Sequence, residues 1–279
     1  MSDGSGWDVE DHPLSASTIK TFDGCPLEFK LKYVDRKQPL GQEPYYLDIG
    51  NAVHYTIEEV LSKELESEGS VNYDDLKSMF LLHYPDVIGG TFRHVEPDPR
   101  QDFPIELDDE QEEIVVGCLD TAAKWLGKEE PTIRGVEHEV DFRINRADMD
   151  APFTGYMDLT TEGSDANWVV DWKTGKSEGK EMDEALQGAV YMAGFYNRYG
   201  VEPDAIQFVY LKEGTVRSIE PDDKLWDTLI EKALLLLQAA ETGEFQAQPS
   251  ESNCHWCDYE LHCPASPVGA GAVDWEQYP

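Results

Sequence analysis

The sequence predicts a mixed α/β protein with a helical N-terminal part. Before residue 130, and again over residues 181–199 and 222–242, apolar residues recur at the spacing of an amphipathic helix. Between residues 133 and 219, short apolar or alternating runs are bounded by glycine, serine and aspartate, which is typical of β-strands. The order is helices, three strands, a helix, two strands and a helix, which indicates a mixed sheet covered by helices.

The length of 279 residues is sufficient for a buried core, and we expect one domain. Residues 1–13 are expected to be disordered, and residues 266–279 to form a flexible tail. The domain between them, residues 14–265, is predicted to have four parts. These are a helical part (14–130), an α/β core (131–220), a further helix (221–248) and a short cysteine-bearing segment (249–265).

The helical part is predicted to begin at a serine cap. Ser15 or Ser17 can serve as the N-cap of a helix from Thr18 to about Asp23, which ends at Gly24-Cys25-Pro26. We expect further helices over residues 27–35, 47–66, 74–84 and 110–127, and a loop over residues 85–104. His54 falls near the apolar face of the helix 47–66, where a histidine is more often a packed residue than a ligand.

The α/β core contains a predicted hairpin between Gly155 and Gly175. Two β-rich segments, residues 155–159 and 169–173, are separated by a polar turn of glycine, serine, aspartate and asparagine. Before the hairpin, residues 133–144 alternate as one strand, with Glu137 and Glu139 on the face opposite the apolar residues. The remaining predicted elements are a helix over 181–199, strands over 205–211 and 215–219, and a helix over 222–242.

The hairpin carries charged residues at otherwise apolar positions. Asp171 and Lys173 are two residues apart on one strand and therefore share a face, and Asp158 on the other strand can lie beside them. Two carboxylates and a lysine can hold a hard divalent cation and position a water molecule next to it. The alternative is that both aspartates simply face solvent. Gln187 and Tyr191, spaced i, i+4 on the following helix, share one face as well.

The cysteines indicate a second site. Five cysteines, an odd number, argue against a disulfide framework in a cytoplasmic chain. Cys254, Cys257 and Cys263 have a metal-ligand spacing in a short segment, and Cys25, which also precedes a proline, is a candidate fourth ligand. His255 or His262 could instead complete a zinc site with three cysteines, and reduced thiols without a metal are the remaining alternative.

The charge of the chain is extreme. With 57 acidic and 22 basic residues, the net charge is −35, a composition that resembles proteins of extreme halophiles. Such a charge argues against nucleic acid as a general partner. A local basic stretch nevertheless occurs within residues 20–37, as either a nucleic-acid path or a solvated helix face; its cations are Lys20, Lys30, Lys32, Arg36 and Lys37.

The sequence also restricts location and energy source. It has no run of about 18 apolar residues and no signal-peptide pattern at its start, so we expect a cytoplasmic location. It has no Gly-x4-Gly-Lys-Ser/Thr phosphate-binding loop, so any helicase activity must come from another chain.

Four motifs in order resemble the RecB-like branch of the PD-(D/E)XK nucleases. They are Gly50-x3-His54, Gly155-x2-Asp158, Asp171-x-Lys173 and Gln187-x3-Tyr191. The cysteine arrangement is similar to that of the iron–sulfur subgroup, which includes CRISPR-associated RecB-like exonucleases and the nuclease domain of AddB. The resemblance covers roughly residues 14–265 and implies a restriction-endonuclease-like fold. Asp171 stands where many members have glutamate.

The resemblance implies a role for each motif residue. His54, Asp158, Asp171 and the carbonyl of Trp172 would bind Mg²⁺ or Mn²⁺, and Lys173 would position or activate the attacking water. Gln187 and Tyr191 would contact DNA or brace the site, and Glu137 or Glu139 would support the ligands.

The resemblance further implies that Cys25, Cys254, Cys257 and Cys263 hold a structural [4Fe–4S] cluster that clamps the N-terminal helices over the sheet. The implied activity is a metal-dependent exonuclease on single-stranded DNA or DNA ends, with 5′→3′ polarity. A separate helicase or CRISPR integration proteins are possible partners. The alternative function is a non-catalytic DNA-binding or adaptor subunit of a DNA repair or spacer-acquisition complex.

Overall fold

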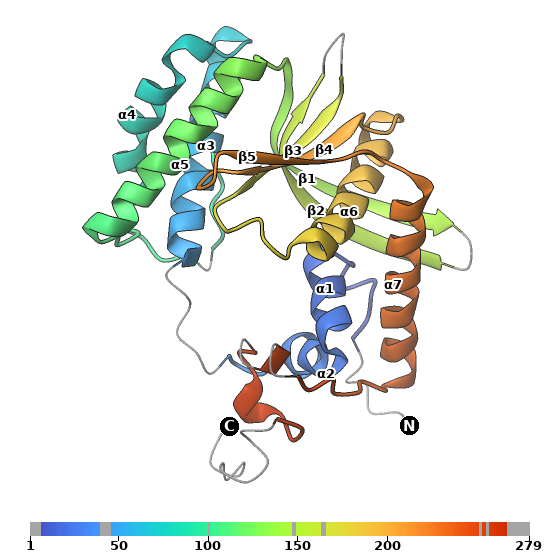
Figure 1. The fold of residues 1–279 in the computed structure, drawn as a ribbon. Coiled ribbons are helices and arrows are strands. Elements are labelled where there is room, and N and C mark those ends of the chain that lie inside the picture. Colours follow the sequence, from blue (N-terminus) through green and yellow to red (C-terminus); the bar gives the residue numbers. More distant parts are fainter. Residues whose placement is uncertain are drawn as a thin grey trace. The chain divides into compact units, whose positions relative to one another are not determined.

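A computed structural model describes residues 7–39, 46–99, 101–146, 149–162, 166–250, 253–254 and 257–266 (Figure 1). It confirms the mixed α/β class. The α-helices are α1 (Ala16–Gly24), α2 (Pro26–Phe29), α3 (Tyr46–Glu68), α4 (Leu76–Ile88), α5 (Asp109–Glu129), α6 (Glu181–Tyr199) and α7 (Asp223–Thr242). The strands are β1 (Ile133–Arg146), β2 (Met149–Thr161), β3 (Trp168–Lys173), β4 (Ala205–Tyr210) and β5 (Thr215–Ile219).

The described part of the chain divides into two compact units. The first, which we call the cysteine unit, comprises Met1–Gln42, Asp141–Gly155 and Asp222–Pro279. The second, which we call the sheet unit, comprises Glu43–Val140 and Tyr156–Pro221. Strands β1 and β2 therefore contribute residues to both units.

The strands form one five-stranded sheet in the order β1-β2-β3-β4-β5. The predicted hairpin is confirmed, because β2 and β3 pair antiparallel through Leu159↔Val170 and Thr160↔Val169. Strand β3 pairs in parallel with β4, and α6 makes the connection between them. Strands β4 and β5 pair antiparallel. Strand β2 begins six residues before the predicted start at Gly155.

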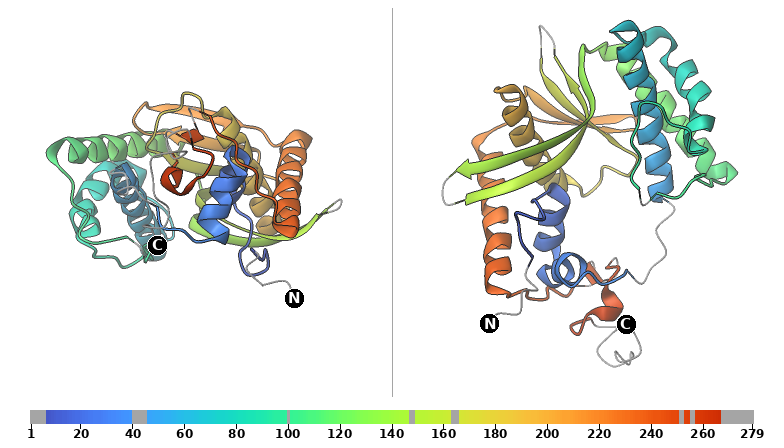
Figure 2. Two further views of the ribbon diagram at one scale, coloured as in Figure 1. Left: turned by 90° about the horizontal axis from the view of Figure 1, so that it is seen from below. Right: turned by 180° about the vertical axis from the view of Figure 1, so that it is seen from behind.

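The alternation of side chains along β3 separates the core from the polar face. Val170 and Trp172 point into an apolar core that they share with α3, α4 and α5. Asp171 and Lys173 point to the opposite face, against which α6 packs. In Figures 1 and 2, α3, α4 and α5 lie together as one helical layer.

The helix boundaries follow from local capping. Of the two predicted caps, Ser15 is the one that caps α1, where it receives the backbone N–H of Thr18, so the helix begins two residues before the predicted Thr18. Asp108 caps α5 in a reciprocal arrangement with Gln111, so this helix begins one residue earlier than predicted.

Two predicted elements differ in the structure. The loop predicted from residue 85 begins later, because α4 continues through Pro85 to Ile88 while Tyr84 and Val87 anchor its last turn in the core. The predicted helix over 27–35 is α2 followed by a π-helical turn, Lys30–Val34, in which the N–H of Asp35 bonds the carbonyl of Lys30 at 2.8 Å.

The cysteine unit has a core of its own. Helices α1 and α7 pack side by side, joined by an ion pair of 2.5 Å between Asp23 and Lys232 (Figure 2). Phe29 stacks on Phe245 with ring centroids 5.9 Å apart, and Trp7 packs edge-on against Phe29. Residues 1–6 and 267–279, which cover part of the predicted disordered start and most of the predicted tail, lie outside the described residues.

Among the described residues, no helix is both long and apolar enough to cross a membrane.

Candidate functional site

The site lies in the sheet unit, where the pairing of β2 with β3 stops. The last backbone pair is Leu159↔Val170, so the next positions on the two strands are Asp158 and Asp171. There the carboxylate of Asp158 accepts the backbone N–H of Trp172 at 2.7 Å. A side chain thus takes the place of a backbone hydrogen bond between the two strands. Both carboxylates lie at this point where the strands separate, which we call the fork.

Asp171 is buried in a network of polar side chains from β3 and α6. Its Oδ2 lies 2.6 Å from Nζ of Lys173, and its Oδ1 accepts from the amide of Gln187 at 3.0 Å and from the hydroxyl of Tyr191. Lys173 also donates to Oε1 of Gln187 at 2.8 Å. The predicted pair Gln187 and Tyr191 therefore braces Asp171 and Lys173, and α6 fixes both side chains.

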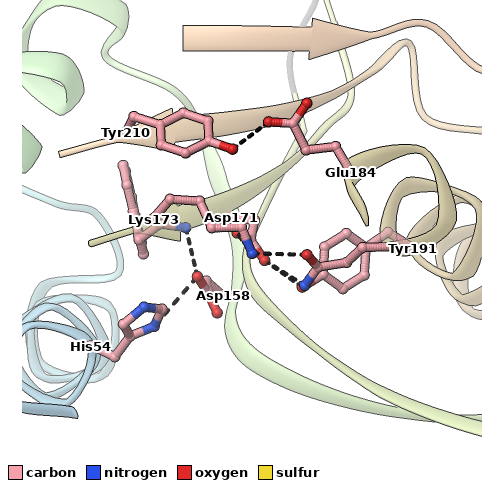
Figure 3. Close-up of polar contacts among 9 residues, drawn as sticks. His54, Asp158, Asp171, Lys173, Glu184, Tyr191 and Tyr210 are labelled. Carbon is pink, nitrogen blue, oxygen red and sulfur yellow. Dashed lines mark hydrogen bonds and ion pairs between the residues drawn. The ribbon is translucent and has the colours of Figure 1, made fainter. Parts of the chain in front are cut away.

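His54 reaches the same site from α3. Its Nδ1 lies 3.4 Å from Oδ2 of Asp158, and its side chain is 28% exposed (Figure 3). Burial alone would lower the pKa of His54, but the carboxylates of Asp158, Glu137 and Asp171 raise it to about 9. The imidazole is therefore protonated at neutral pH when no cation shares the site.

Glu137 of β1 joins this group. Its φ is +42°, in the left-handed region of backbone conformation. One ligand atom each from His54, Glu137 and Asp158 lies within 4.8 Å of the others. Glu139 differs, because it is exposed and accepts the hydroxyl of Tyr156 at 2.8 Å. Tyr156 and Asp158 are two residues apart on β2 and share a face, so their proximity to Glu139 and Glu137 agrees with the prediction that both glutamates lie on one face.

The acids of the site repel one another. Burial and the charges of Glu137 and Asp158 raise the pKa of Glu58 to about 8. Burial and Asp158 likewise raise the pKa of Glu137, and burial raises that of Asp171 in spite of the Lys173 ammonium. A divalent cation would relieve this repulsion, because it would supply the positive charge that the carboxylates lack.

The donor set fits a hard divalent cation. Carboxylate oxygens with one imidazole suit Mg²⁺ or Mn²⁺, and His54, Glu137 and Asp158 lie close enough together to hold it. Asp171, a predicted ligand, is outside this group, and its two oxygens contact Lys173 and the amide of Gln187. The N–H and C=O of a strand residue point to the same neighbouring strand. Because the N–H of Trp172 faces Asp158, its carbonyl lies on the same side, and its role as a ligand stays a prediction.

Sequence reasoning missed Glu58 and Glu184. Glu58 follows His54 by four residues on α3 and so shares its face, and that spacing was a usable signal. Glu184 precedes Gln187 by three residues on α6, but its importance depends on Tyr210 and Arg217 from distant strands. No local spacing indicates that contact.

The cysteine unit brings four cysteines together. Cys25, Cys254, Cys257 and Cys263 line one cavity, next to Glu28 of α2. Burial, Glu28 and the neighbouring thiols raise the pKa of Cys257 to about 12, and burial with Cys25 and Cys254 raises that of Cys263. Four sulfur donors around one cavity fit a tetrahedral zinc ion or an iron–sulfur cluster.

The structure also bears on the alternative fourth ligands. His262 is turned to the carbonyl of Gln38, 3.2 Å from its Nε2, and is not among the cavity residues. His255 lies outside the described residues.

The basic stretch 20–37 is partly neutralised within its own unit. Lys30 is neutralised by Asp35, 2.7 Å away, whereas Arg36 bonds the imidazole of His12 at 2.7 Å, which supplies no negative charge. Whether this stretch contacts nucleic acid stays a prediction.

Comparisons with known proteins agree with the geometry. Residues 13–264 match the model of the PD-(D/E)XK nuclease superfamily. A crystal structure of a protein from Eubacterium rectale, assigned as an exonuclease, is similar with a TM-score of 0.50 and 14% identity, covering 98% of each chain. The crystal structure of SSO0001 has a TM-score of 0.38 and 15% identity, covering 76% of this chain and 95% of that one. At such identities the first likeness concerns the fold alone, and the second supports no argument. No curated protein matches the chain.

Proposed function

The chain belongs to the PD-(D/E)XK nuclease superfamily, and from this premise we propose that it is a metal-dependent DNA exonuclease. Its substrate would be single-stranded DNA or DNA ends, with 5′→3′ polarity. The observation that carries the proposal is the meeting of Asp158, Asp171, Lys173 and His54 at the fork between β2 and β3. The exonuclease assignment of the similar Eubacterium rectale protein is consistent with it.

In this proposal His54, Glu137, Asp158 and Asp171 hold the cation, with the carbonyl of Trp172 as a further ligand. The cation, Mg²⁺ or Mn²⁺, supplies Lewis acidity toward the scissile phosphate and lowers the pKa of water. His54 binds as the neutral imidazole, so it gives up the proton that the surrounding carboxylates hold on it.

We assign Lys173 a direct role in the reaction. Burial lowers its pKa, but Asp171 and Asp158 outweigh that effect and raise it, so the side chain is an ammonium at neutral pH. Gln187 and Asp171 fix its Nζ at 2.8 Å and 2.6 Å. A fixed ammonium can position the attacking water and stabilise negative charge on the phosphoryl oxygens.

For the cysteine unit we propose a structural [4Fe–4S] cluster bound by Cys25, Cys254, Cys257 and Cys263. The cluster would tie residue 25 to residues 254–263 and so close a loop of more than 200 residues in sequence. A four-cysteine zinc site is the alternative, and metal analysis separates the two.

The setting of the enzyme is part of the proposal. We expect a cytoplasmic enzyme of a halophile, with DNA as substrate and a separate helicase or CRISPR integration proteins as partners. The composition supports the halophilic origin, because high salt screens the repulsion among the 57 acidic residues.

The deciding experiment uses single strands labelled at the 5′ or the 3′ end, with Mn²⁺ at high salt. Release of the 5′ label as a short product before the 3′ label would establish the polarity. Asp171→Asn is the matched inactive control. Cleavage that survives complete chelation of divalent cations would overturn the proposed mechanism. Binding of strands without cleavage by the native protein would favour the adaptor alternative.

A further inference from the structure

Glu184, at the start of α6, is a buried acid outside the group that would hold a cation. It is 3% exposed, and both of its carboxylate oxygens are bound. The hydroxyl of Tyr210 donates to Oε1 (Figure 3). Nε of Arg217 lies 3.1 Å from Oε2. Three elements of the sheet unit therefore meet at this carboxylate: α6, β4 and β5.

Arg217 also contacts the loop that precedes α6 and the first turn of that helix. Its Nη1 donates to the carbonyl of Ser177 at 2.8 Å, and its Nη2 lies 3.0 Å from Glu181. One guanidinium thus binds the loop before α6 and the first turn of the helix. The sheet position that carries Arg217 is fixed by its pairing with Phe208 on β4.

This network lies one helical turn from the candidate site. Gln187 follows Glu184 by three residues and so occupies the same face of α6. Tyr210 is the parallel-strand partner of Lys173, because the register pairs these two residues. Gln187 contacts both Lys173 and Asp171, at 2.8 Å and 3.0 Å.

In the ion pair between Glu184 and Arg217 the carboxylate is buried while the Arg217 side chain is 29% exposed, and such a pair is a poor means of stabilising a fold. Desolvation offsets much of the attraction, and well-packed apolar side chains of similar size often give equal or greater stability. The contacts of Glu184 with Tyr210 and Arg217 are directional. They fix the orientation and the position of the first turn of α6 relative to β4 and β5.

We propose that Glu184 is a positioning residue, held by Arg217 and Tyr210, which sets the amide of Gln187 between Lys173 and Asp171. The proposal rests on the proposed nuclease function for its catalytic consequence. Its structural content, the placement of one amide group, can be measured without any activity.

The kinetic test compares Glu184→Gln with Glu181→Gln. Glu181 is a matched control, because it is on the same turn and also contacts Arg217, but its side chain is 65% exposed. We expect Glu184→Gln to lower kcat by about 100-fold, the usual effect of a misplacement near 1 Å, with KM within about 2-fold. Glu181→Gln should leave both constants unchanged. Glu184→Asp, which keeps the charge, should recover part of the loss.

A double-mutant cycle separates positioning from general loss of structure. In a Gln187→Ala background, Glu184→Gln should cost less than about 2-fold in kcat, because the group it positions is gone. Two losses that multiply independently would overturn the proposal. So would a Glu184→Gln protein with unchanged kcat. If this variant does not fold, Tyr210→Phe removes one hydrogen bond from the same carboxylate and takes its place in the cycle.

A second readout does not require cleavage. In the native protein the side-chain NH₂ of Gln187 donates to Asp171 and is protected, so its NMR signals should exchange slowly with water. Glu184→Gln should shift these signals and speed their exchange, and Glu181→Gln should not. Unchanged Gln187 signals would refute the positioning role even in a protein that cleaves no DNA. Conversely, absence of cleavage by the native protein would count against the proposed function alone.

Discussion

The carboxylate of Asp158 receives the backbone N–H of Trp172 at 2.7 Å, so a side chain of β2 is fixed to the main chain of β3. The contact lies where the backbone ladder between the two strands ends after Leu159↔Val170. Because the carboxylate of Asp158 is bonded to a backbone N–H, its position does not depend on the rotamer of another side chain. The fork between two strands therefore fixes one carboxylate, and α6 fixes the other.

Replacing Asp158 by asparagine should separate charge from geometry. Asparagine still accepts the N–H of Trp172 through its amide oxygen, but it no longer adds a negative charge beside Glu137 and Asp171. We expect Mn²⁺ affinity to fall by at least about 100-fold, because even residues that only support a ligand can cost that much, while the melting temperature in chelator is unchanged or higher. Calorimetric Mn²⁺ titration and thermal melting measure the two effects. Unchanged affinity would remove Asp158 from the ligand set.

The metal-free protein should lose stability as pH rises. The folded pKa values of Glu58 (about 8) and Glu137 lie above the ordinary value of 4.5. That of His54 (about 9) lies above 6.5. For each group the native state holds more protons than the unfolded chain, so its contribution is complete below the unfolded pKa and is lost as pH rises through the folded pKa.

Thermal melting in chelator, from about pH 5 to about pH 9, measures this loss. We expect the melting temperature in chelator to fall as the pH rises. Mn²⁺ should raise the melting temperature more at the alkaline end of the range than at the acidic end, because the ligands are then already deprotonated. Glu58→Gln should flatten the decline. A melting temperature that rises with pH in chelator would contradict the charges assigned to the site.

Salt should stabilise the protein strongly. The net charge of −35 repels itself across the surface, and raising salt from about 0.1 M to about 1 M shortens the screening length from about 10 Å to about 3 Å. We expect the melting temperature to increase steadily with KCl over this range. A chloride series at fixed pH measures it, with glycerol as the control for a non-ionic solute. A melting temperature independent of salt would show that the acidic surface is not under repulsive strain.

The cluster that we propose for the cysteine cavity should be lost when one thiol is removed. Cys25→Ser removes one of the four sulfur donors that line the cavity. Cys25 is near the N-terminus, whereas the other three cysteines lie within residues 254–263. We expect iron and acid-labile sulfide to fall severalfold together in anaerobically purified protein, with loss of visible absorption. Cys118→Ser is the matched control, since Cys118 is buried in the core of the sheet unit. One zinc per chain in the native protein, without iron, would replace the cluster by a zinc site.

Local patterns predicted the elements well. The hairpin was visible in the sequence because both strands are β-rich and a glycine, serine and aspartate turn separates them, and β2 and β3 pair as expected. The pair Asp171 and Lys173 was predictable for the same reason, since a two-residue spacing fixes a common strand face.

The parts that escaped prediction depend on nonlocal geometry. Glu137 rather than Glu139 lies beside His54 and Asp158, and which of the two glutamates meets α3 depends on the tertiary fold. The roles of Tyr210 and Arg217 require knowing that β4 and β5 lie beside β3. Pro85 within α4 likewise depends on tertiary packing, which outweighs the helix-breaking tendency of proline.

The division of the chain into two units has a consequence for the order of synthesis. All residues of the sheet unit have been made once residue 221 leaves the ribosome, whereas the cysteine unit needs Cys254, Cys257 and Cys263 beside Cys25. Since segments fold as they emerge, the sheet unit can form while the cysteines of the C-terminal segment are still untranslated. A metal bound by the four cysteines would then be inserted last, and a chain truncated before residue 254 would carry the residues of the candidate site without three of these cysteines.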